Sequence, residues 1–373
     1  MPFWASTKQS LTSKLSQLRF SRRRDDTEPL APNLDGHLEN GKETSATSSN
    51  RSEKGIFTKV NSFVDICVCL RIDKSILRRK EIADLDHPTP MQNCGRECFI
   101  IAAHQVIFYT PPLVHHIKTN EGKEQAGLDR VMKNVLANYL AKKGFTSCTN
   151  ILDLYPGYKK GKPHDSNEFL QSHYERYFKT AFSLPQETRT WKCSVCEYMK
   201  ITGPEGAILS LPPPPPTNKN SPGYMATFKE DKEGKEKEDR HCDFCDCERS
   251  GTVKSEYAFS NMIMVFANPK ATITMFEDVV DLSSIEPGTE GTDGLWNLSG
   301  VVWHIKREKE EDSHYVAVVK HKDEFYLMND HNYTNMGSNP DYDLLRAYYG
   351  KAQYAVYYRS TWKERMDARS QRQ

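Results

Sequence analysis

Hydrophobic spacing in the first half of the chain predicts helices. Residues 127–144, GLDRVMKNVLANYLAKKG, place apolar side chains three and four positions apart, as on one face of an amphipathic helix. Residues 165–182 predict a further helix, with Asp165 as its N-cap residue. The run that follows Cys98, FIIAAHQVIFY, is apolar almost all round. We therefore expect a buried helix there, ended by Pro111 and Pro112.

The second half changes to short segments of β-branched and aromatic residues. Between residues 261 and 360, polar breaks separate six predicted strands: NMIMVFA, ATITMFEDVV, WNLSGVVWHI, SHYVAVVKH, EFYLMND and AQYAVYYRS. Helices followed by antiparallel strands predict an α+β fold. In such a fold we expect a cleft between a helical part and a sheet.

Three segments are too polar to predict a packed structure. Residues 1–57 hold few apolar side chains, so we expect a disordered tail. Residues 212–240 contain five consecutive prolines and the run KEDKEGKEKEDR, which predicts a mobile insertion. Residues 361–373 read as a charged tail. The predicted folded domain therefore spans residues 58–360.

Charge and cysteine content exclude several classes of protein. With 51 basic and 50 acidic residues the formal charge is +1, so no overall field attracts nucleic acid. No run of about 18 apolar residues occurs, so no transmembrane segment is predicted. The ten cysteines, without a secretory segment, predict reduced or metal-bound thiols in an intracellular protein of the cytoplasm or nucleus.

The N-terminal end of the tail is basic. No acidic residue precedes Asp25, and Phe3, Trp4 and Leu11 can share one helical face with further leucines. This pattern leaves four interpretations open: a solvated basic tail, a mitochondrial-type presequence, a membrane-surface helix or a nuclear-import patch.

Cys98 stands at the start of the predicted buried helix. The N-terminus of a helix carries partial positive charge, which favours a thiolate and therefore a nucleophile. Asn93 lies five residues upstream, close enough in a tight loop for its side-chain amide to donate to an oxyanion beside the sulfur. Gly95 lets this loop turn sharply. A buried structural cysteine is the alternative interpretation.

A histidine and an asparagine far downstream complete a candidate catalytic set. His314 opens one predicted strand and Asn329 ends the next, so a hairpin would bring them together. His314 can take the thiol proton while Asn329 orients the imidazole ring, a Cys-His-Asn arrangement. Taken alone, a histidine in this position is more often an ordinary strand residue.

Two Cys-x-x-Cys pairs predict a metal site. Four thiolates suit tetrahedral Zn²⁺, and the 45 residues between the pairs fit two hairpin ends held together. The expected ligands of one structural zinc ion are Cys193, Cys196, Cys242 and Cys245. Cys247 and His241 are alternative ligands, and redox or incidental cysteines are the alternative interpretation.

Four segments together resemble the ubiquitin-specific proteases. Residues 93–108, NCGRECFIIAAHQVIF, are similar to the family's cysteine box, N-x-G-N-T-C-Y-x-N-[SA]-x-x-Q. Residues 164–170, HDSNEFL, are similar to its Q-D-A-x-E-F-L segment. HYVAVVK and FYLMND resemble its histidine box, and AQYAVYYR resembles its closing strand. The segments occur in the family's order and, with the Cys-x-x-Cys pairs between them, cover residues 88–360.

The resemblance implies a fold and an activity. The fold would be the papain-like cysteine protease fold of the ubiquitin-specific protease type, with a helical thumb, a β-rich palm and zinc-bearing fingers over about residues 190–260. The activity would be that of a thiol-dependent deubiquitinase, which hydrolyses the isopeptide or peptide bond at the C-terminal glycine of ubiquitin or a ubiquitin-like modifier. Expected partners are that modifier and ubiquitinated proteins, and we expect a monomer.

The resemblance also implies roles for single residues. The implied catalytic residues are Cys98 as nucleophile, His314 as general base and acid, Asn329 orienting the histidine and Asn93 at the oxyanion. Asp165 and Tyr315 would line the channel for the modifier's tail. Asp165 acting only as an N-cap is the competing interpretation, and the two are compatible.

The chain departs from the family's pattern around the nucleophile. Arg96 and Glu97 stand where Asn and Thr are usual, and Glu97 would oppose a thiolate that Arg96 favours. Ser313 replaces a glycine before the histidine, His164 replaces a glutamine, and Asn329 stands where Asp is commoner. A catalytically weak or inactive ubiquitin-binding adaptor with the same fold is therefore the second hypothesis. A zinc-stapled structural protein, the third, leaves the Cys-His-Asn order unexplained.

Overall fold

Helices come first along the chain, as predicted. The computed structural model describes residues 74–120, 126–142, 146–179, 181–206, 209–210, 225, 228–229, 232, 236–267, 276–289, 291–305 and 313–371. The helices before the strands are α2 (Lys74–Arg79), η2 (Ile82–Asp84), α3 (Cys98–Phe108), α4 (Pro111–Thr119), α5 (Ala126–Leu140), α6 (Thr149–Leu152), α7 (Ser166–His173) and its π-helical continuation η3 (Tyr174–Phe178). Those near the C-terminus are η4 (Gly291–Gly294), α9 (Tyr342–Tyr349) and α10 (Trp362–Ser370).

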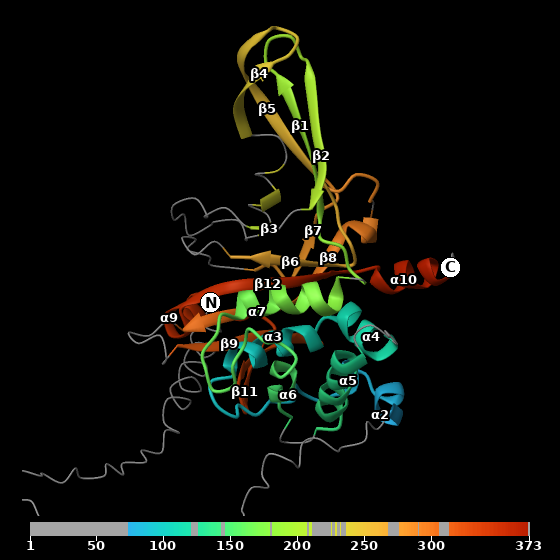
Figure 1. Ribbon diagram of the computed structural model, residues 1–373, viewed down its shortest axis with the longest axis vertical. Helices are drawn as coiled ribbons and strands as arrows, with labels where there is room; N and C mark the ends of the chain where they lie inside the picture. The colour runs from blue at the N-terminus through green and yellow to red at the C-terminus, as the bar shows by residue number, and fades with distance from the viewer. Residues whose placement is uncertain are drawn as a thin grey trace, which may run out of the picture. The chain divides into compact units, whose positions relative to one another are not determined.

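The described strands form two sheets (Figure 1). The small sheet has the order β2-β1-β5-β4, and the large sheet has the order β11-β10-β9-β8-β12-β6-β3, with β7 paired to β8. Strands of the small sheet are β1 (Gln186–Cys193), β2 (Met199–Gly206), β4 (Glu236–Cys242) and β5 (Cys247–Ala258). Those of the large sheet are β3 (Leu209–Ser210), β6 (Met262–Phe266), β7 (Val279–Asp281), β8 (Leu295–Ile305), β9 (His314–His321), β10 (Glu324–Asn329), β11 (Asn332–Gly337) and β12 (Lys351–Arg359). Helices and a mainly antiparallel sheet confirm the predicted α+β class.

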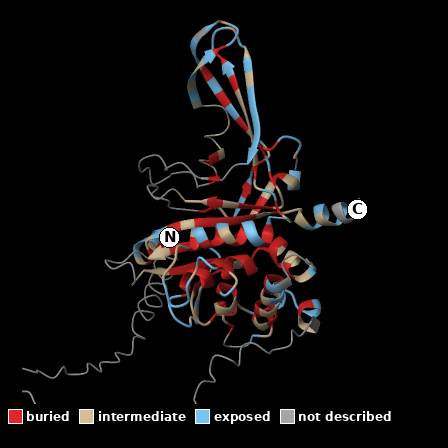
Figure 2. Cartoon of the chain, in the orientation of Figure 1, coloured by how far each residue is buried: buried red, intermediate tan, exposed pale blue. Residues whose placement is uncertain are grey.

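Helix α3 is the centre of the core. All eleven of its residues are buried, as the apolar run predicts, and the helix contacts β8, β9 and β10 as well as α4 and α7 (Figure 2). Its two polar side chains bond internally: Gln105 donates to the carbonyl of Thr89, and Nδ1 of His104 lies 2.9 Å from the carbonyl oxygen of Ile100. No single described helix is long and apolar enough to cross a membrane, although α3 and α4 together, bent by 93°, match a broken span by length and composition.

Several boundaries differ from the sequence-based expectation. Pro111 does follow the end of the buried helix, but it also begins α4, because proline is tolerated in the first turn, where its missing N–H is not needed. Within the predicted charged tail, residues 362–370 form α10. β4 begins at Glu236, inside the segment assigned to the insertion at 212–240.

The chain divides into two units, residues 1–71 and 72–373, and every described residue belongs to the second. The predicted disordered tail at 1–57 therefore lies outside the described residues, as do most of the insertion and residues 271–275 of one predicted strand.

Two buried histidines are stacked among the helices. His104 and His173 are both 0 % exposed, and their ring centroids lie 5.2 Å apart. Burial lowers the pKa of His104 to about 4, although its bond to Ile100 opposes the shift. Burial also lowers the pKa of His173 well below its usual value. Both rings are therefore neutral in the folded chain at physiological pH.

We expect the free energy of unfolding to fall as the pH decreases from 7 to 5. The unfolded chain binds protons at these histidines near pH 6.5, whereas the folded chain does not, so acid favours unfolding. For His104 alone the loss is about 2 kcal/mol over this interval. Urea denaturation at the two pH values measures this loss of stability. The control is His331→Gln, which changes an exposed histidine and should leave the dependence of stability on pH unchanged. Equal stability at pH 7 and 5 would contradict the buried neutral rings.

Candidate active site

The loop before α3 is held by the side chain of Asn93. Its Oδ1 accepts hydrogen bonds from the backbone N–H groups of Gly95 and Glu97, both at 3.0 Å. The loop turns through Gly95 and Arg96, whose φ angles are 134° and 53°. This loop delivers Cys98 to the first position of α3, as predicted, with only 7 % of the residue exposed.

The β9–β10 hairpin brings His314 and Asn329 together. His314 begins β9, Asn329 ends β10, and the imidazole Nε2 lies 2.7 Å from the Asn329 Oδ1. An amide oxygen only accepts, so His314 donates through Nε2. Cys98 lies close enough to His314 to raise the pKa of its ring. The structure therefore brings Cys98, His314 and Asn329, which are far apart in the sequence, to one place.

Asp330 belongs to this site and was missed by the sequence analysis. Its Oδ2 accepts a hydrogen bond from Nδ2 of Asn93 at 3.1 Å and lies 3.8 Å from Nε2 of His314. Its Oδ1 is buried without a hydrogen-bond partner among the described residues. Asp330 occupies the tight turn between β10 and β11 with a φ of 50°. The only available signal was its place directly after Asn329 at the end of a predicted strand.

The surroundings of His314 favour the imidazolium. Burial alone would lower its pKa, because it penalises the charged ring. The hydrogen bond and charge of Cys98, the Asp330 carboxylate and the bond to Asn329 outweigh burial and raise the pKa to about 9. His314 therefore carries the proton at neutral pH.

The Glu97 carboxyl group next to Cys98 is buried and hydrogen-bonded. The residue is 2 % exposed, and its Oε2 accepts a hydrogen bond from the Thr149 hydroxyl at 2.7 Å. Burial raises the pKa of Glu97, although the bonds from Thr149 and from the backbone of Cys94 oppose the shift. The carboxyl group therefore ties the loop before α3 to the start of α6.

Asp165 and Tyr315 form a pair beside the catalytic set. Asp165 Oδ1 accepts from the backbone N–H groups of Asn167 and Glu168 at 2.7 and 3.1 Å, so the predicted N-cap is confirmed. Its Oδ2 accepts from the Tyr315 hydroxyl at 3.3 Å. Tyr315 is buried next to His314, and its ring stacks on His304 with centroids 4.3 Å apart. Both interpretations of Asp165 are thus compatible with the geometry.

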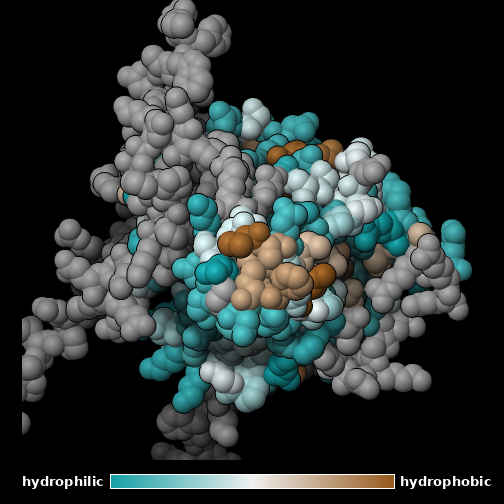
Figure 3. Space-filling view, turned by 90° about the horizontal axis from the view of Figure 1, so that it is seen from above, coloured by the Kyte–Doolittle hydropathy of each residue, from teal (hydrophilic) through white to brown (hydrophobic). Residues whose placement is uncertain are grey.

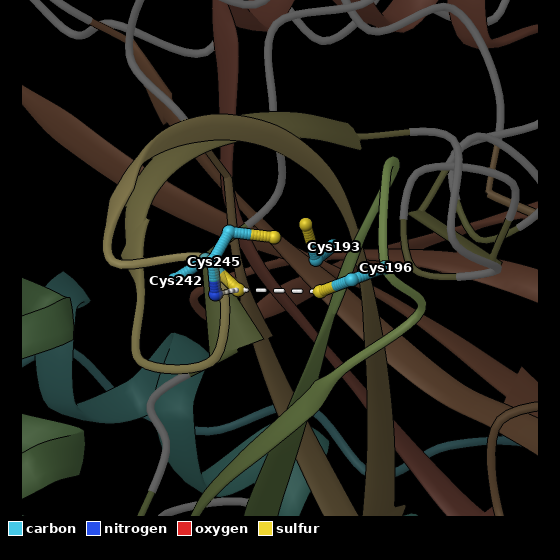
Figure 4. Close-up of side chains that lie close together, drawn as sticks. All are labelled: Cys193, Cys196, Cys242 and Cys245. Carbon is cyan, nitrogen blue, oxygen red and sulfur yellow. Dashed lines mark hydrogen bonds between the residues drawn. The ribbon is translucent and has the colours of Figure 1, made fainter.

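The four predicted metal ligands meet at one end of the small sheet (Figure 4). Each Cys-x-x-Cys pair sits in a tight turn closed by a backbone hydrogen bond, from Glu197 to Cys193 at 3.1 Å and from Asp246 to Cys242 at 2.8 Å. Glu197 and Asp246 both have positive φ, 63° and 54°. The two turns therefore share one geometry, that of paired thiolate knuckles.

The sulfur positions suit a tetrahedral ion. The four Sγ atoms all lie within 4.8 Å of one another, and those of Cys196 and Cys242 are 3.5 Å apart. Four sulfurs at about 2.3 Å from a zinc ion would be separated by about 3.8 Å. His241 instead lies 3.4 Å from the Asp246 carboxylate, outside the four-cysteine group.

Little apolar packing holds this end of the small sheet. Its buried cluster consists of Trp191, Cys193, Cys242 and Val253. Several large apolar side chains near the two Cys-x-x-Cys turns are exposed: Val195, Met199, Ile201 and Phe244. The view from above in Figure 3 shows an apolar patch on the surface. A metal ion bound by the four cysteines would supply the cross-link that this small core lacks.

Neither protein-family models nor curated protein sequences match the chain. Among solved structures it is similar to the SAGA Ubp8/Sgf11/Sus1/Sgf73 DUB module bound to ubiquitin aldehyde, with a TM-score of 0.54 and 13 % identity over 72 % of this chain and 69 % of that one. It is also similar to a SAGA DUB module that contains a variant of Ubp8 and is bound to monoubiquitin, with a TM-score of 0.55 and 15 % identity over 75 % and 70 % of the two chains. At this identity the likeness shows a shared fold, that of Ubp8, a ubiquitin-specific protease.

We expect the imidazole of His314 to titrate at a pH of about 9 in nuclear magnetic resonance spectra of labelled protein. Asp330→Asn should lower this pKa, because it removes one of the charges that stabilise the imidazolium. Asp323→Asn, at the far end of the same hairpin, is the matched control and should leave the titration unchanged. A His314 ring that titrates at its ordinary pKa in the parent protein would contradict the paired site.

Proposed function

We propose that this chain is a thiol-dependent deubiquitinase, a cysteine-type peptidase that cleaves after the C-terminal glycine of ubiquitin or a ubiquitin-like modifier. A fold alone does not fix an activity, so the proposal rests on the site. The observation that carries it is the contact of His314 with both Cys98 and Asn329. The fold likeness to DUB modules bound to ubiquitin aldehyde and to monoubiquitin adds the class of substrate.

The chemistry follows from the proton that His314 holds. The Cys98 thiolate attacks the carbonyl carbon of the terminal glycine, which forms a C–S bond and a tetrahedral oxyanion. As the C–N bond breaks, the leaving lysine amine takes the proton of His314, and a thioester remains. Neutral His314 then removes a proton from water, whose oxygen attacks the thioester. The C–S bond then breaks, which regenerates the thiolate–imidazolium pair and frees a carboxylic acid, whose proton passes through solvent to the released amine.

Asn93 is the candidate donor to the oxyanion. Its Nδ2 carries two hydrogens, and the bond to Asp330 uses one of them, so the other can point to the developing charge. Asp330 would fix the amide in this orientation while its charge faces the imidazolium. Asn329 would orient the ring, a role that a neutral amide can fill.

Asp165 and Tyr315 are candidates for binding the modifier's C-terminal tail. Tyr315 directly follows His314, and its hydroxyl holds the Asp165 carboxylate. Ser313 precedes His314 at the position where the resembled family has glycine. We expect its side chain to narrow the access of a tail that ends in Gly-Gly.

The remaining parts take their proposed names from the papain-like fold. The helices would form the thumb, the large sheet the palm, and the small sheet the fingers. A zinc ion on Cys193, Cys196, Cys242 and Cys245 would be structural, because four thiolates leave no open position for a substrate.

A ubiquitin-binding adaptor without activity is the second candidate. Glu97 directly before Cys98 favours it, because a carboxylate there would oppose a thiolate. The hydrogen bond to Thr149 and the raised pKa of Glu97 reduce that opposition. Ubiquitin binding by the parent protein without any hydrolysis would favour the adaptor.

Cys98→Ser is expected to abolish hydrolysis of a fluorogenic ubiquitin C-terminal amide while ubiquitin binding persists, because a hydroxyl is a far poorer nucleophile than a thiolate. His314→Ala should cost about as much, since the two residues act as one unit. Asn93→Ala should lower kcat by about 10²- to 10³-fold, the range for one oxyanion donor. Cys94→Ser, which changes an exposed thiol in the same loop, is the control. Cleavage by Cys98→Ser at the parent's rate would refute the proposed nucleophile.

Elemental analysis of natively purified protein should find one zinc ion per chain. The double variant Cys196→Ser, Cys245→Ser should lose it, and amide exchange in β1, β2, β4 and β5 should rise by about tenfold or more while α3 stays protected, because packing alone is weak at the knuckles. Cys94→Ser should keep the ion. A parent protein without zinc, or a double variant that retains zinc, would contradict a zinc site at these four cysteines.

A further inference from the structure

A cavity of about 530 Å³ lies at the ends of α3 and β9 that are remote from the candidate active site. Cys98 and His314 are the first residues of these two elements, whereas Phe108 and His321, at their last positions, line the cavity. The ten residues from Cys98 to Phe108 rise about 15 Å along a helix. Residues of η2, α4, β8, β12 and α10 also line it. The cavity is therefore separate from the catalytic set.

Positive charge surrounds this cavity, which we call the lysine groove. Its lysines are Lys118, Lys320, Lys322 and Lys363. Among the described lining residues, Glu81 carries the single negative charge. Lys118 lies 2.7 Å from Glu81, and Lys320 lies 2.6 Å from Asp278. Lys322 and Lys363 form no ion pair with any residue in the described ranges, so their charges remain available to a ligand.

The floor of the lysine groove is apolar and aromatic. Phe108, Val114 and Leu298 are buried beneath it, and Tyr358 and Trp362 are partly exposed at its side. The Trp362 ring packs against His115 with centroids 5.8 Å apart, which holds it in place. A partly exposed aromatic ring above buried apolar side chains can bind an apolar anchor side chain of a ligand.

We propose that the lysine groove binds an acidic peptide segment of a partner protein through one apolar anchor side chain. The anchor would occupy the floor beside Trp362. Carboxylates on either side of it would pair with Lys322 and Lys363, and the net positive charge of the rim would speed the encounter. This surface goes beyond the proposed hydrolysis and does not depend on it.

The placement of the lysines favours a peptide over a compact anion. They come from three separate parts of the fold: α4, the β9–β10 hairpin and α10. A single phosphate needs donors that converge on one point. Carboxylates spaced along an extended chain instead match charges that are distributed around an apolar floor. Lys118 already holds the carboxylate of Glu81 in this way at the rim.

Fluorescence anisotropy with a defined peptide pool tests the proposal on the full chain. The probe is a labelled pool of seven-residue peptides with Leu, Phe or Trp at the centre and Asp or Glu elsewhere. A control pool carries Asn and Gln in place of the acids. The test variant is Lys322→Glu with Lys363→Glu. The matched control is Lys237→Glu with Lys254→Glu, which makes the same charge change on exposed positions of the small sheet.

We expect saturable binding of the acidic pool, weakened at least tenfold by the groove variant, unchanged in the matched control and reduced by added salt. Trp362→Ala should weaken binding without removing its salt dependence. No saturable binding, equal binding by the groove variant, or equal binding of the uncharged pool would each overturn the proposal. Because binding is measured without hydrolysis, an inactive enzyme would leave this result interpretable.

Discussion

Burial of α3 is the constraint on which the site depends. Every side chain of this helix is enclosed, so it cannot rotate or slide without exposing apolar surface or breaking the internal bonds of Gln105. Gly300 on β8 permits the close approach, since a Cβ there would lie 2.6 Å from the carbonyl oxygen of Val318 and 3.2 Å from Val106. A fixed helix has a fixed N-terminus. The position of Cys98 relative to His314, on the strand that α3 packs against, follows from this packing.

A second contact fixes the position of the loop before α3 relative to the large sheet. Asn93 binds the loop backbone through its oxygen and Asp330 through its nitrogen, while Met91 donates to the Asp330 carbonyl at 3.1 Å. The turn that follows Asn329 is thereby joined to the loop that precedes Cys98. The same bridge brings a carboxylate to 3.8 Å from His314. The Asn93–Asp330 pair therefore both holds the loop before Cys98 in place and puts a negative charge near His314.

The sequence predicted those parts of the site that depend on local pattern. The apolar run predicted α3, β-branched and aromatic segments with polar breaks predicted β9 and β10, and the spacing of the Cys-x-x-Cys pairs predicted the four clustered sulfurs. Asp330 was missed because its role comes from a turn that folds back onto Asn93, more than 230 residues away in the chain. The setting of Glu97 was equally unreadable, since its buried bond to Thr149 is a tertiary contact. Pro111 was interpreted only as a helix end, although the same residue begins α4.

The central claim is that Cys98 is an activated thiolate at a site that receives the tail of ubiquitin or a ubiquitin-like modifier. Probes of these modifiers with a C-terminal electrophile, followed by proteolysis and mass spectrometry, test it most directly, because the electrophile reacts only when the tail lies beside a competent thiolate. The account predicts an adduct on Cys98 that is lost in His314→Ala, with exposed Cys94 unmodified. No adduct with any probe, or an adduct on Cys94 in place of Cys98, would contradict it.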